Sequence, residues 1–238
     1  RPVLNGHQHD EIEYVLGVIE NPRRTRRGYE ATLRFSDRED VAPVWQDIED
    51  GILSHVVREA GGTKAKIVVV PTASSIPVEV ADNYLQAFDT LGCTNIAVAD
   101  IRKRSQSEQK ETIKMFEEAD AVMFSGGDQS KIVKYIGDTT IHNILLDRYK
   151  NEDFVIAGTS AGAMCMSQEM VAGGSSQESL YKGAVKMREG MGFIKGLVID
   201  THFIKRGRFG RLAEAMAIHP NLLGLGLAED TGIIIKNA

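Results

Sequence analysis

An uninterrupted run of β-branched residues within residues 65–71 (AKIVVVP) constrains the fold of this chain more than any other segment. Such a run fits a strand that is buried on both faces, which is the usual situation of a strand in a parallel sheet. From residue 64 onward, strand and helix patterns alternate with short links between them. This order predicts an α/β fold of three layers, in which a mostly parallel sheet carries helices on both faces.

The periodicity of the apolar residues predicts where the individual elements lie. We expect strands at residues 14–19, 29–35, 65–71, 96–101, 121–124, 154–157, 197–199 and 232–235. We expect helices at residues 44–60, 78–92, 107–119, 131–136, 141–150, 161–170 and 209–218. The first sixty residues carry the weakest pattern, and we treat residues 1–238 as a single domain.

The composition excludes several classes of protein. The apolar fraction of 42% supplies enough side chain for a folded core, which argues against disorder. Lys and Arg number 28 against 33 Asp and Glu, and the resulting charge of −5 argues against a nucleic-acid partner. The least charged stretch, residues 154–168, is interrupted by polar residues and is too short to span a membrane.

The cysteine count and the N-terminus bear on the compartment of the protein. Two cysteines are too few for a disulfide framework or a four-thiolate zinc site, and we expect Cys165 to be a buried, inert thiol. The chain begins at Arg1 and shows no leader of basic and then apolar residues. We expect a cytoplasmic location, with secretion left as the alternative.

The segments that follow three of the predicted strands are the candidate functional site. Ligands of open α/β sheets bind beyond the carboxyl ends of the strands. The segments at these ends read SGGDQ at residues 125–129, GTSAG at residues 158–162 and DTHF at residues 200–203. We expect them to meet at one edge of the sheet.

The GTSAG segment matches the Gly-x-Ser-x-Gly pattern of a nucleophile elbow. A sharp turn from strand to helix exposes the hydroxyl of Ser160, and the flanking glycines allow the close backbone approach that this turn needs. The N–H of Ala161 is then a candidate oxyanion donor, and Gly127 is the candidate for a second donor. The alternatives are simple packing of small residues around Ser160 and a tight turn capped by Asp128.

A serine nucleophile requires a base, and the base requires a carboxylate that orients it. Of the six histidines, His202 is the candidate base because it directly follows an apolar strand at the predicted edge. Asp200 and Glu229 compete as the orienting carboxylate, and the residues alone do not decide between them. Four cations follow His202, namely Lys205, Arg206, Arg208 and Arg211. They are interpreted as a pocket for carboxylates, with a solvated basic turn or a phosphate site as alternatives.

Four ordered blocks of this sequence resemble the signature blocks of the cyanophycinases. The blocks are FSGGDQ, IAGTSAGAMCMS, VIDTHFIKRGRFGRL and LGLGLAEDTG, and PTAS at residues 71–74 also matches. The cyanophycinases are serine peptidases related to the aspartyl dipeptidases, with a sheet core like that of class I glutamine amidotransferases. The similarity covers roughly residues 60–238. The strand ending in a glycine pair with which the family usually begins is not found here.

The resemblance implies a function and a role for each matched residue. Ser160 is implied as nucleophile, His202 as general base and Glu229 as the acidic member of the triad. The implied substrate-binding residues are Gln129, Asp200, Arg206, Arg208 and Arg211. The implied substrate is cyanophycin, a poly-aspartate with arginine on each side-chain carboxyl, and the implied product is β-aspartyl-arginine. The resemblance implies a homodimer and calls for no metal and no organic cofactor.

Two other functions compete with this interpretation. An α-aspartyl or isoaspartyl dipeptidase would use the same Ser-His-Glu triad on short substrates. A non-catalytic protein would use the arginine-rich segment to bind an acidic ligand. A true α/β-hydrolase is disfavoured, because its triad runs Ser, acid, His along the chain.

Overall fold

The computed structural model describes residues 17–25, 28–35, 45–174, 183–229 and 231–236. These residues belong to two compact units. The first, called here the Ser160 unit, comprises Glu49–Met170 and Glu189–Phe193. The second, called the His202 unit, comprises Arg1–Ile48, Val171–Arg188 and Ile194–Ala238. Each unit is described by itself, and the single domain expected over residues 1–238 stays a prediction.

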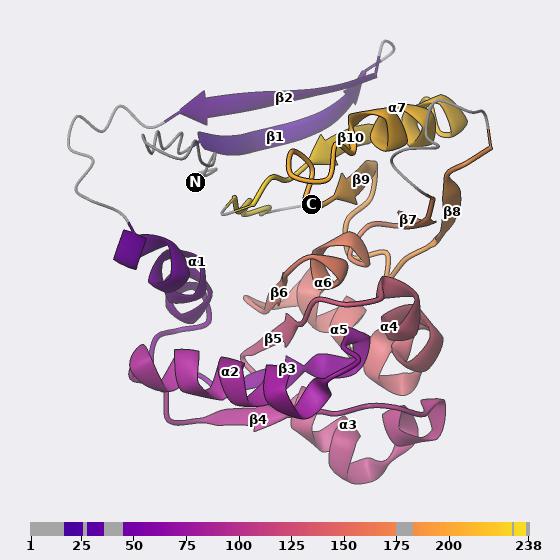
Figure 1. Ribbon diagram of the computed structural model, residues 1–238. Helices are drawn as coiled ribbons and strands as arrows, with labels where there is room; N and C mark the ends of the chain where they lie inside the picture. Colours follow the sequence, from indigo (N-terminus) through magenta and orange to yellow (C-terminus); the bar gives the residue numbers. More distant parts are fainter. Residues whose placement is uncertain (1–16, 26–27, 36–44, 175–182, 230, 237–238) are drawn as a thin grey trace. The chain divides into compact units, whose positions relative to one another are not determined.

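A four-stranded parallel sheet forms the centre of the Ser160 unit (Figure 1). Its strands lie in the order β4-β3-β5-β6, and every neighbouring pair is parallel. The strands are β3 (Ile67–Val70), β4 (Ile96–Val98), β5 (Ala121–Phe124) and β6 (Val155–Gly158). All residues of β3 and β5 are buried, as expected for strands covered on both faces.

Helices and short turns precede, connect and follow these strands. The α-helices are α1 (Trp45–Glu59), α2 (Pro77–Thr90), α3 (Lys110–Glu117), α4 (Gln129–Ile136), α5 (Thr140–Asn151) and α6 (Ala161–Met164). Two 3₁₀ turns, η1 (Pro71–Ala73) and η2 (Arg104–Glu108), follow β3 and the segment after β4. Pro77 opens α2, because its fixed φ and missing N–H suit the first turn of a helix. Asp128 and Thr139 cap α4 and α5 with their side-chain oxygens.

Alternate residues of β3 and β5 point to opposite faces of the sheet, and both faces are covered. Ile67 and Val69 pack in one cluster with Val57 of α1 and Phe88 of α2. On the other face, the ring of Phe124 stacks against Phe193 at 6.4 Å between centroids. Side chains of α5 contact that same Phe193 ring. The predicted α/β fold, a mostly parallel sheet flanked by helices, is confirmed.

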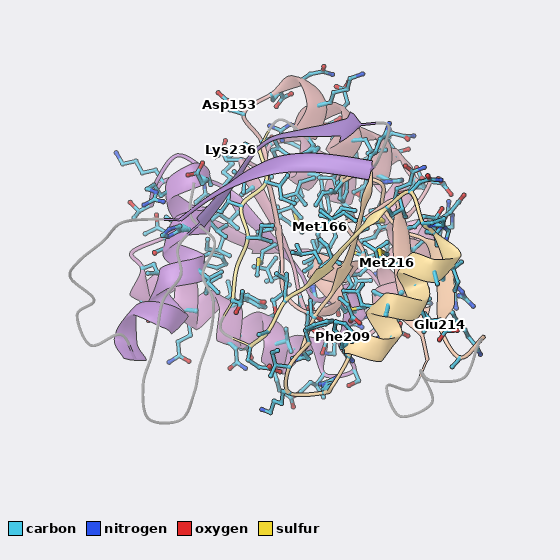
Figure 2. All side chains as sticks on the ribbon, turned by 90° about the horizontal axis from the view of Figure 1, so that it is seen from above. Asp153, Met166, Phe209, Glu214, Met216 and Lys236 are labelled. Atoms are coloured by element: carbon cyan, nitrogen blue, oxygen red, sulfur yellow. The ribbon has the colours of Figure 1, made fainter. Side chains whose placement is uncertain are left out.

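The described residues of the His202 unit form three strand pairs, the beginning of α1 and one complete helix. β9 (Leu197–Asp200) pairs in parallel with β10 (Leu223–Gly226), and β1 (Gly17–Thr25) pairs antiparallel with β2 (Gly28–Phe35). β7 (Glu169–Gly173) pairs with β8 (Lys186–Glu189), both at the margin of this unit. The helix α7 (Phe209–Ile218) carries Met216 (Figure 2) and packs on β10. Met216 lies so near Gly224 of β10 that a Cβ on Gly224 would be 2.9 Å from Met216 Sδ.

Two sequence predictions are wrong within the described residues. The helix expected at 161–170 ends at Met164, because backbone N–H groups of Gly190, Met191 and Gly192 bond the carbonyls of residues 165–168. Residues 232–235 form no strand, and β10 pairs with β9 instead. β7 and β8 were not expected. Of the strand expected at 14–19, residues 14–16 lie outside the described residues. None of the described helices is both long and apolar enough to cross a membrane.

Gly162 is the position where a single methyl group should disturb the sheet most clearly. A Cβ on Gly162 would overlap the carbonyl oxygen of Phe124, which is backbone and has no rotamer by which to move away. We expect Gly162→Ala to destabilise the protein by about 2–3 kcal/mol or more, as overpacking does in a tight core. Urea unfolding followed by circular dichroism measures this change.

The matched control is Gly51→Ala in α1, where a Cβ meets no atom within 4 Å. The same substitution should there leave stability unchanged or raise it by up to ~1 kcal/mol, because alanine favours a helix more than glycine does. Equal stability of Gly162→Ala and the wild type would contradict the close contact between α6 and β5.

Candidate active site

Ser160 lies at a strained turn between β6 and α6. Its backbone has φ 53° and ψ −114°, a conformation that non-glycine residues adopt rarely and at a cost of about 1–3 kcal/mol. Hydrogen bonds hold the turn on both sides. Thr159 donates its N–H to the carbonyl of Phe124 at 3.1 Å, and Met164 donates its N–H to the carbonyl of Ser160 at 2.9 Å. These hydrogen bonds therefore fix the backbone that carries the serine side chain.

The two glycines of the GTSAG segment are required by close backbone contacts. A Cβ on Gly158 would lie 2.5 Å from the carbonyl carbon and oxygen of Gly162. A Cβ on Gly162 would overlap the carbonyl of Phe124, as described above. The pattern Gly-x-Ser-x-Gly thus allows α6 to begin directly beside β5 and β6. Cys165, at the end of α6, is fully buried, and burial raises the pKa of its thiol, as expected for an inert cysteine.

The glycine pair after β5 lies against Ser160. A Cβ built on Gly126 would be 3.3 Å from Ser160 Cβ and 3.8 Å from Ser160 Oγ. Gly127 is exposed and has φ +137°, which glycine adopts far more easily than other residues. Asp128 follows, and its carboxylate accepts the N–H of Ser130 at 2.9 Å at the start of α4. The Ser160 unit by itself therefore places a glycine loop, with its unencumbered backbone, beside the serine.

Tyr84 of α2 supports the elbow from the neighbouring helix. Burial raises the pKa of Tyr84 to about 12, against the smaller opposite effect of a hydrogen bond with the side chain of Thr159. The phenol therefore stays neutral at ordinary pH, and its ring stacks on Phe88 at 6.3 Å. The sequence analysis did not identify Tyr84 as a site residue. The only signal in the sequence was its position on an amphipathic helix that follows the first buried strand.

In the His202 unit, a histidine and a glutamate form a hydrogen-bonded pair. His202 Nδ1 lies 2.9 Å from Glu229 Oε1, and the two side chains are 32% and 27% exposed. Burial raises the pKa of Glu229, but the hydrogen bond and charge of His202, together with backbone N–H groups, outweigh it and lower the pKa below its usual value. Glu229 is therefore ionised at neutral pH, and it is the carboxylate that contacts His202.

Parallel pairing of β9 and β10 brings this pair together from distant segments. The N–H of Leu227 bonds the carbonyl of Asp200 at 2.7 Å, and the N–H of Phe203 bonds the carbonyl of Leu227 at 3.0 Å. These two hydrogen bonds hold the segments that follow β9 and β10 side by side. His202 lies between these hydrogen bonds and has φ 51°, a positive value that it shares with Ser160 and Asp138 among the described non-glycine residues.

Asp200, the other candidate carboxylate, is engaged with the cations that follow His202. Its side chain is fully buried, and its Oδ2 accepts Arg211 Nε at 2.8 Å. Its Oδ1 accepts Arg211 Nη2 and, at 3.3 Å, Arg208 Nη1. Arg211 is 6% exposed, whereas Arg206 is exposed to solvent. Contact of Asp200 and Arg211 with substrate stays a prediction, since their charged groups already bind each other.

The remaining predicted site residues belong to known elements of the fold. Gln129 is the first residue of α4, and Ala161 is the first residue of α6. Ser160, Gln129 and the glycine loop belong to the Ser160 unit, and the His202–Glu229 pair belongs to the His202 unit. Among the described residues, no three His, Cys, Asp or Glu side chains are grouped so that they could hold a metal ion.

Comparison with known proteins places the chain in a family. Residues 46–238 match the model of peptidase family S51. A cyanophycinase of Trichormus variabilis is 37% identical over 185 residues, which are 78% of this chain and 62% of the relative. A cyanophycinase of Geminocystis herdmanii is 39% identical over 177 residues, 74% of this chain and 65% of the relative. The chain thus spans less than two thirds of the length of these curated relatives.

A solved structure supports the same fold. The crystal structure of a peptidase from an acI-B1 Actinobacterium superimposes with a TM-score of 0.55 at 24% sequence identity. The match covers 79% of this chain and 75% of that chain. The family match extends over most of the chain and includes the elbow, the glycine loop and the His202–Glu229 pair. The chain belongs to peptidase family S51.

Proposed function

We propose that this protein is a serine-type exopeptidase that hydrolyses cyanophycin and releases β-aspartyl-arginine. The observation that carries the proposal is the arrangement around Ser160. Its strained backbone presents the side chain at the carboxyl edge of the sheet, and Gly126 lies so near that a Cβ built on it would be 3.8 Å from Ser160 Oγ. A serine between a glycine loop and the first turn of a helix is the arrangement that acyl transfer requires.

In the proposed reaction, Ser160 Oγ attacks the scissile carbonyl carbon while its proton moves to Nε2 of His202. Glu229 holds the proton of Nδ1 and stabilises the imidazolium that forms. The N–H groups of Gly127 and Ala161 stabilise the oxyanion. His202 then gives its proton to the leaving amine, and water hydrolyses the acyl-enzyme ester. This mechanism requires Ser160 Oγ and His202 Nε2 to come within hydrogen-bond distance.

Two observations support cyanophycin as the substrate. The relatives described above are named cyanophycinases, and the match to the family model, at residues 46–238, contains the proposed triad. The exposed cation Arg206, close to His202 in the sequence, suits an aspartyl carboxylate of the polymer. Binding roles for Gln129 and Arg208, a homodimeric state and a cytoplasmic location belong to the same proposal.

Ser160→Ala removes the proposed nucleophile. We expect the rate of β-Asp-Arg release from cyanophycin to fall at least about 10⁴-fold, because the other triad members act only through the serine. Chromatography of the released dipeptide measures the rate. A fluorophosphonate should label the wild type at Ser160, and mass spectrometry of the digest locates the label.

The control is Ser54→Ala in α1, where the hydroxyl only donates to the carbonyl of Gly51 at 2.9 Å. This variant should release dipeptide as the wild type does. Equal release by Ser160→Ala and the wild type would falsify the mechanism. Rapid hydrolysis of α- or β-aspartyl dipeptides with no turnover of cyanophycin would replace the proposed substrate by the shorter ones.

Glu229→Gln keeps the shape of the side chain and removes its charge. We expect kcat to fall about 10²- to 10⁴-fold, since an amide neither holds the required tautomer of His202 nor stabilises its cation. The pKa of Glu229 lies below its usual value, so the wild-type carboxylate is ionised throughout the range from about pH 6 to pH 8. Steady-state kinetics at pH 7 measures the loss of kcat that follows from removing this charge.

Glu152→Gln is the matched control. Glu152 is an exposed residue that directly follows α5, and it forms an ion pair with Arg148 of that helix. Its kcat should equal that of the wild type. A Glu229→Gln variant with wild-type kcat would exclude Glu229 from the triad, whatever the outcome for Ser160.

A further inference from the structure

Arg102 ties the segment after β4 to the turn after β3. Its Nη1 donates to the carbonyl of Ser74 at 2.8 Å and of Thr72 at 3.3 Å, and its Nη2 donates to the carbonyl of Pro71 at 3.2 Å. Its Nε donates to the carboxylate of Asp100. One guanidinium therefore satisfies three carbonyls of a turn whose residues are all buried.

The backbone of Arg102 is itself held in place. The side-chain oxygen of Gln106 accepts the N–H of Arg102 at 2.7 Å and the N–H of Lys103 at 2.8 Å. The guanidinium is planar and rigid, so its fixed fork determines the positions of the carbonyls that it binds. A lysine at this position could bind one or two of them but would not fix their mutual arrangement.

The turn held by Arg102 in turn supports the glycine loop. The carbonyl of Ala73 accepts the N–H of Asp128 at 3.0 Å. Gly127 is pressed so closely on the same carbonyl that a Cβ there would overlap it. The next residue toward the strand, Gly126, lies against Ser160. A continuous series of contacts therefore runs along the carboxyl edge of the sheet, in the strand order β4, β3, β5, β6 (Figure 1).

We propose that Arg102 is a positioning residue that sets the oxyanion-binding N–H of Gly127 through the η1 turn. This inference rests on the proposed function and deepens it. Arg102 touches neither the serine nor the glycine, and it acts only by fixing the carbonyls of Pro71, Thr72 and Ser74. An oxyanion donor works only where it meets the developing charge, and a misplacement of about 1 Å can lower a rate ~100-fold.

The test replaces Arg102 by methionine, which keeps an unbranched apolar side chain and removes the guanidinium with all of its N–H donors. We expect kcat for cyanophycin to fall about 10- to 100-fold, because the loss of one whole oxyanion donor costs about 10²- to 10³-fold. The KM should change less than about threefold, since the donor acts on the transition state. The rate of fluorophosphonate labelling at Ser160 should fall with kcat. Arg102→Lys should lie between Arg102→Met and the wild type.

Arg104→Met is the matched control from the same loop. Arg104 also binds backbone carbonyls, at 2.9 Å for Asp138 and 3.4 Å for Lys134, but these belong to the last turn of α4 and to the link between α4 and α5. This variant should keep kcat and the labelling rate within about threefold of the wild type, even where its melting temperature falls as much as that of Arg102→Met. Kinetics are measured well below both melting temperatures.

Three outcomes would overturn the inference. A raised KM with unchanged kcat would make Arg102 a substrate-binding residue. Equal loss of kcat in both arginine variants would make the effect one of general stability. Wild-type kcat and labelling in Arg102→Met, with Ser160→Ala inactive, would remove this inference and leave the proposed function standing. Full activity of Ser160→Ala would instead remove the proposed function.

Discussion

The backbone of α6 touches the backbone of β5 at Gly162, and the geometry of the elbow depends on that contact. With no side chain at this position, the helix begins directly above the end of the neighbouring strand. The chain leaving β6 then has room only for a sharp turn, which places Ser160 at φ 53°. The hydrogen bonds of Thr159 and Met164 close the turn on either side. The strain at the serine is thereby maintained by the packing of the whole Ser160 unit.

The two units hold their polar groups in different ways. Around Ser160, contacts and hydrogen bonds between backbone groups fix the position of the serine, and the glycines allow these backbone groups to approach each other. In the His202 unit, the buried ion pair of Asp200 and Arg211 fixes the segment that contains His202. A buried carboxylate is costly unless its oxygens are satisfied, and Asp200 meets this requirement by accepting hydrogen bonds from both Arg208 and Arg211. This pair joins the end of β9 to the start of α7, and His202 lies on the chain between them.

The residue patterns were sufficient for most of the Ser160 unit, because the core strands are buried on both faces and are marked by apolar runs. β3 and β5 lie within the stretches expected from them. The predicted helix at 161–170 was wrong because residues 165–168 bond to residues 190–192, which follow much later in the chain. For β10, the sequence LGLG left strand formation open, and only the structure explains its glycines, because the side chains of Met216 and Phe203 lie over them.

The sequence by itself determined the local chemistry of the site: a serine between glycines after a buried strand, and a histidine after another strand. The tertiary structure decided which carboxylate contacts His202. Asp200 is nearer in the sequence, yet it points into a buried ion pair, while Glu229 arrives from the neighbouring strand. It also decided that Arg102 supports the glycine loop. Both depend on which strand ends lie side by side, and strand pairing is set by packing over the whole sheet, which no local pattern encodes.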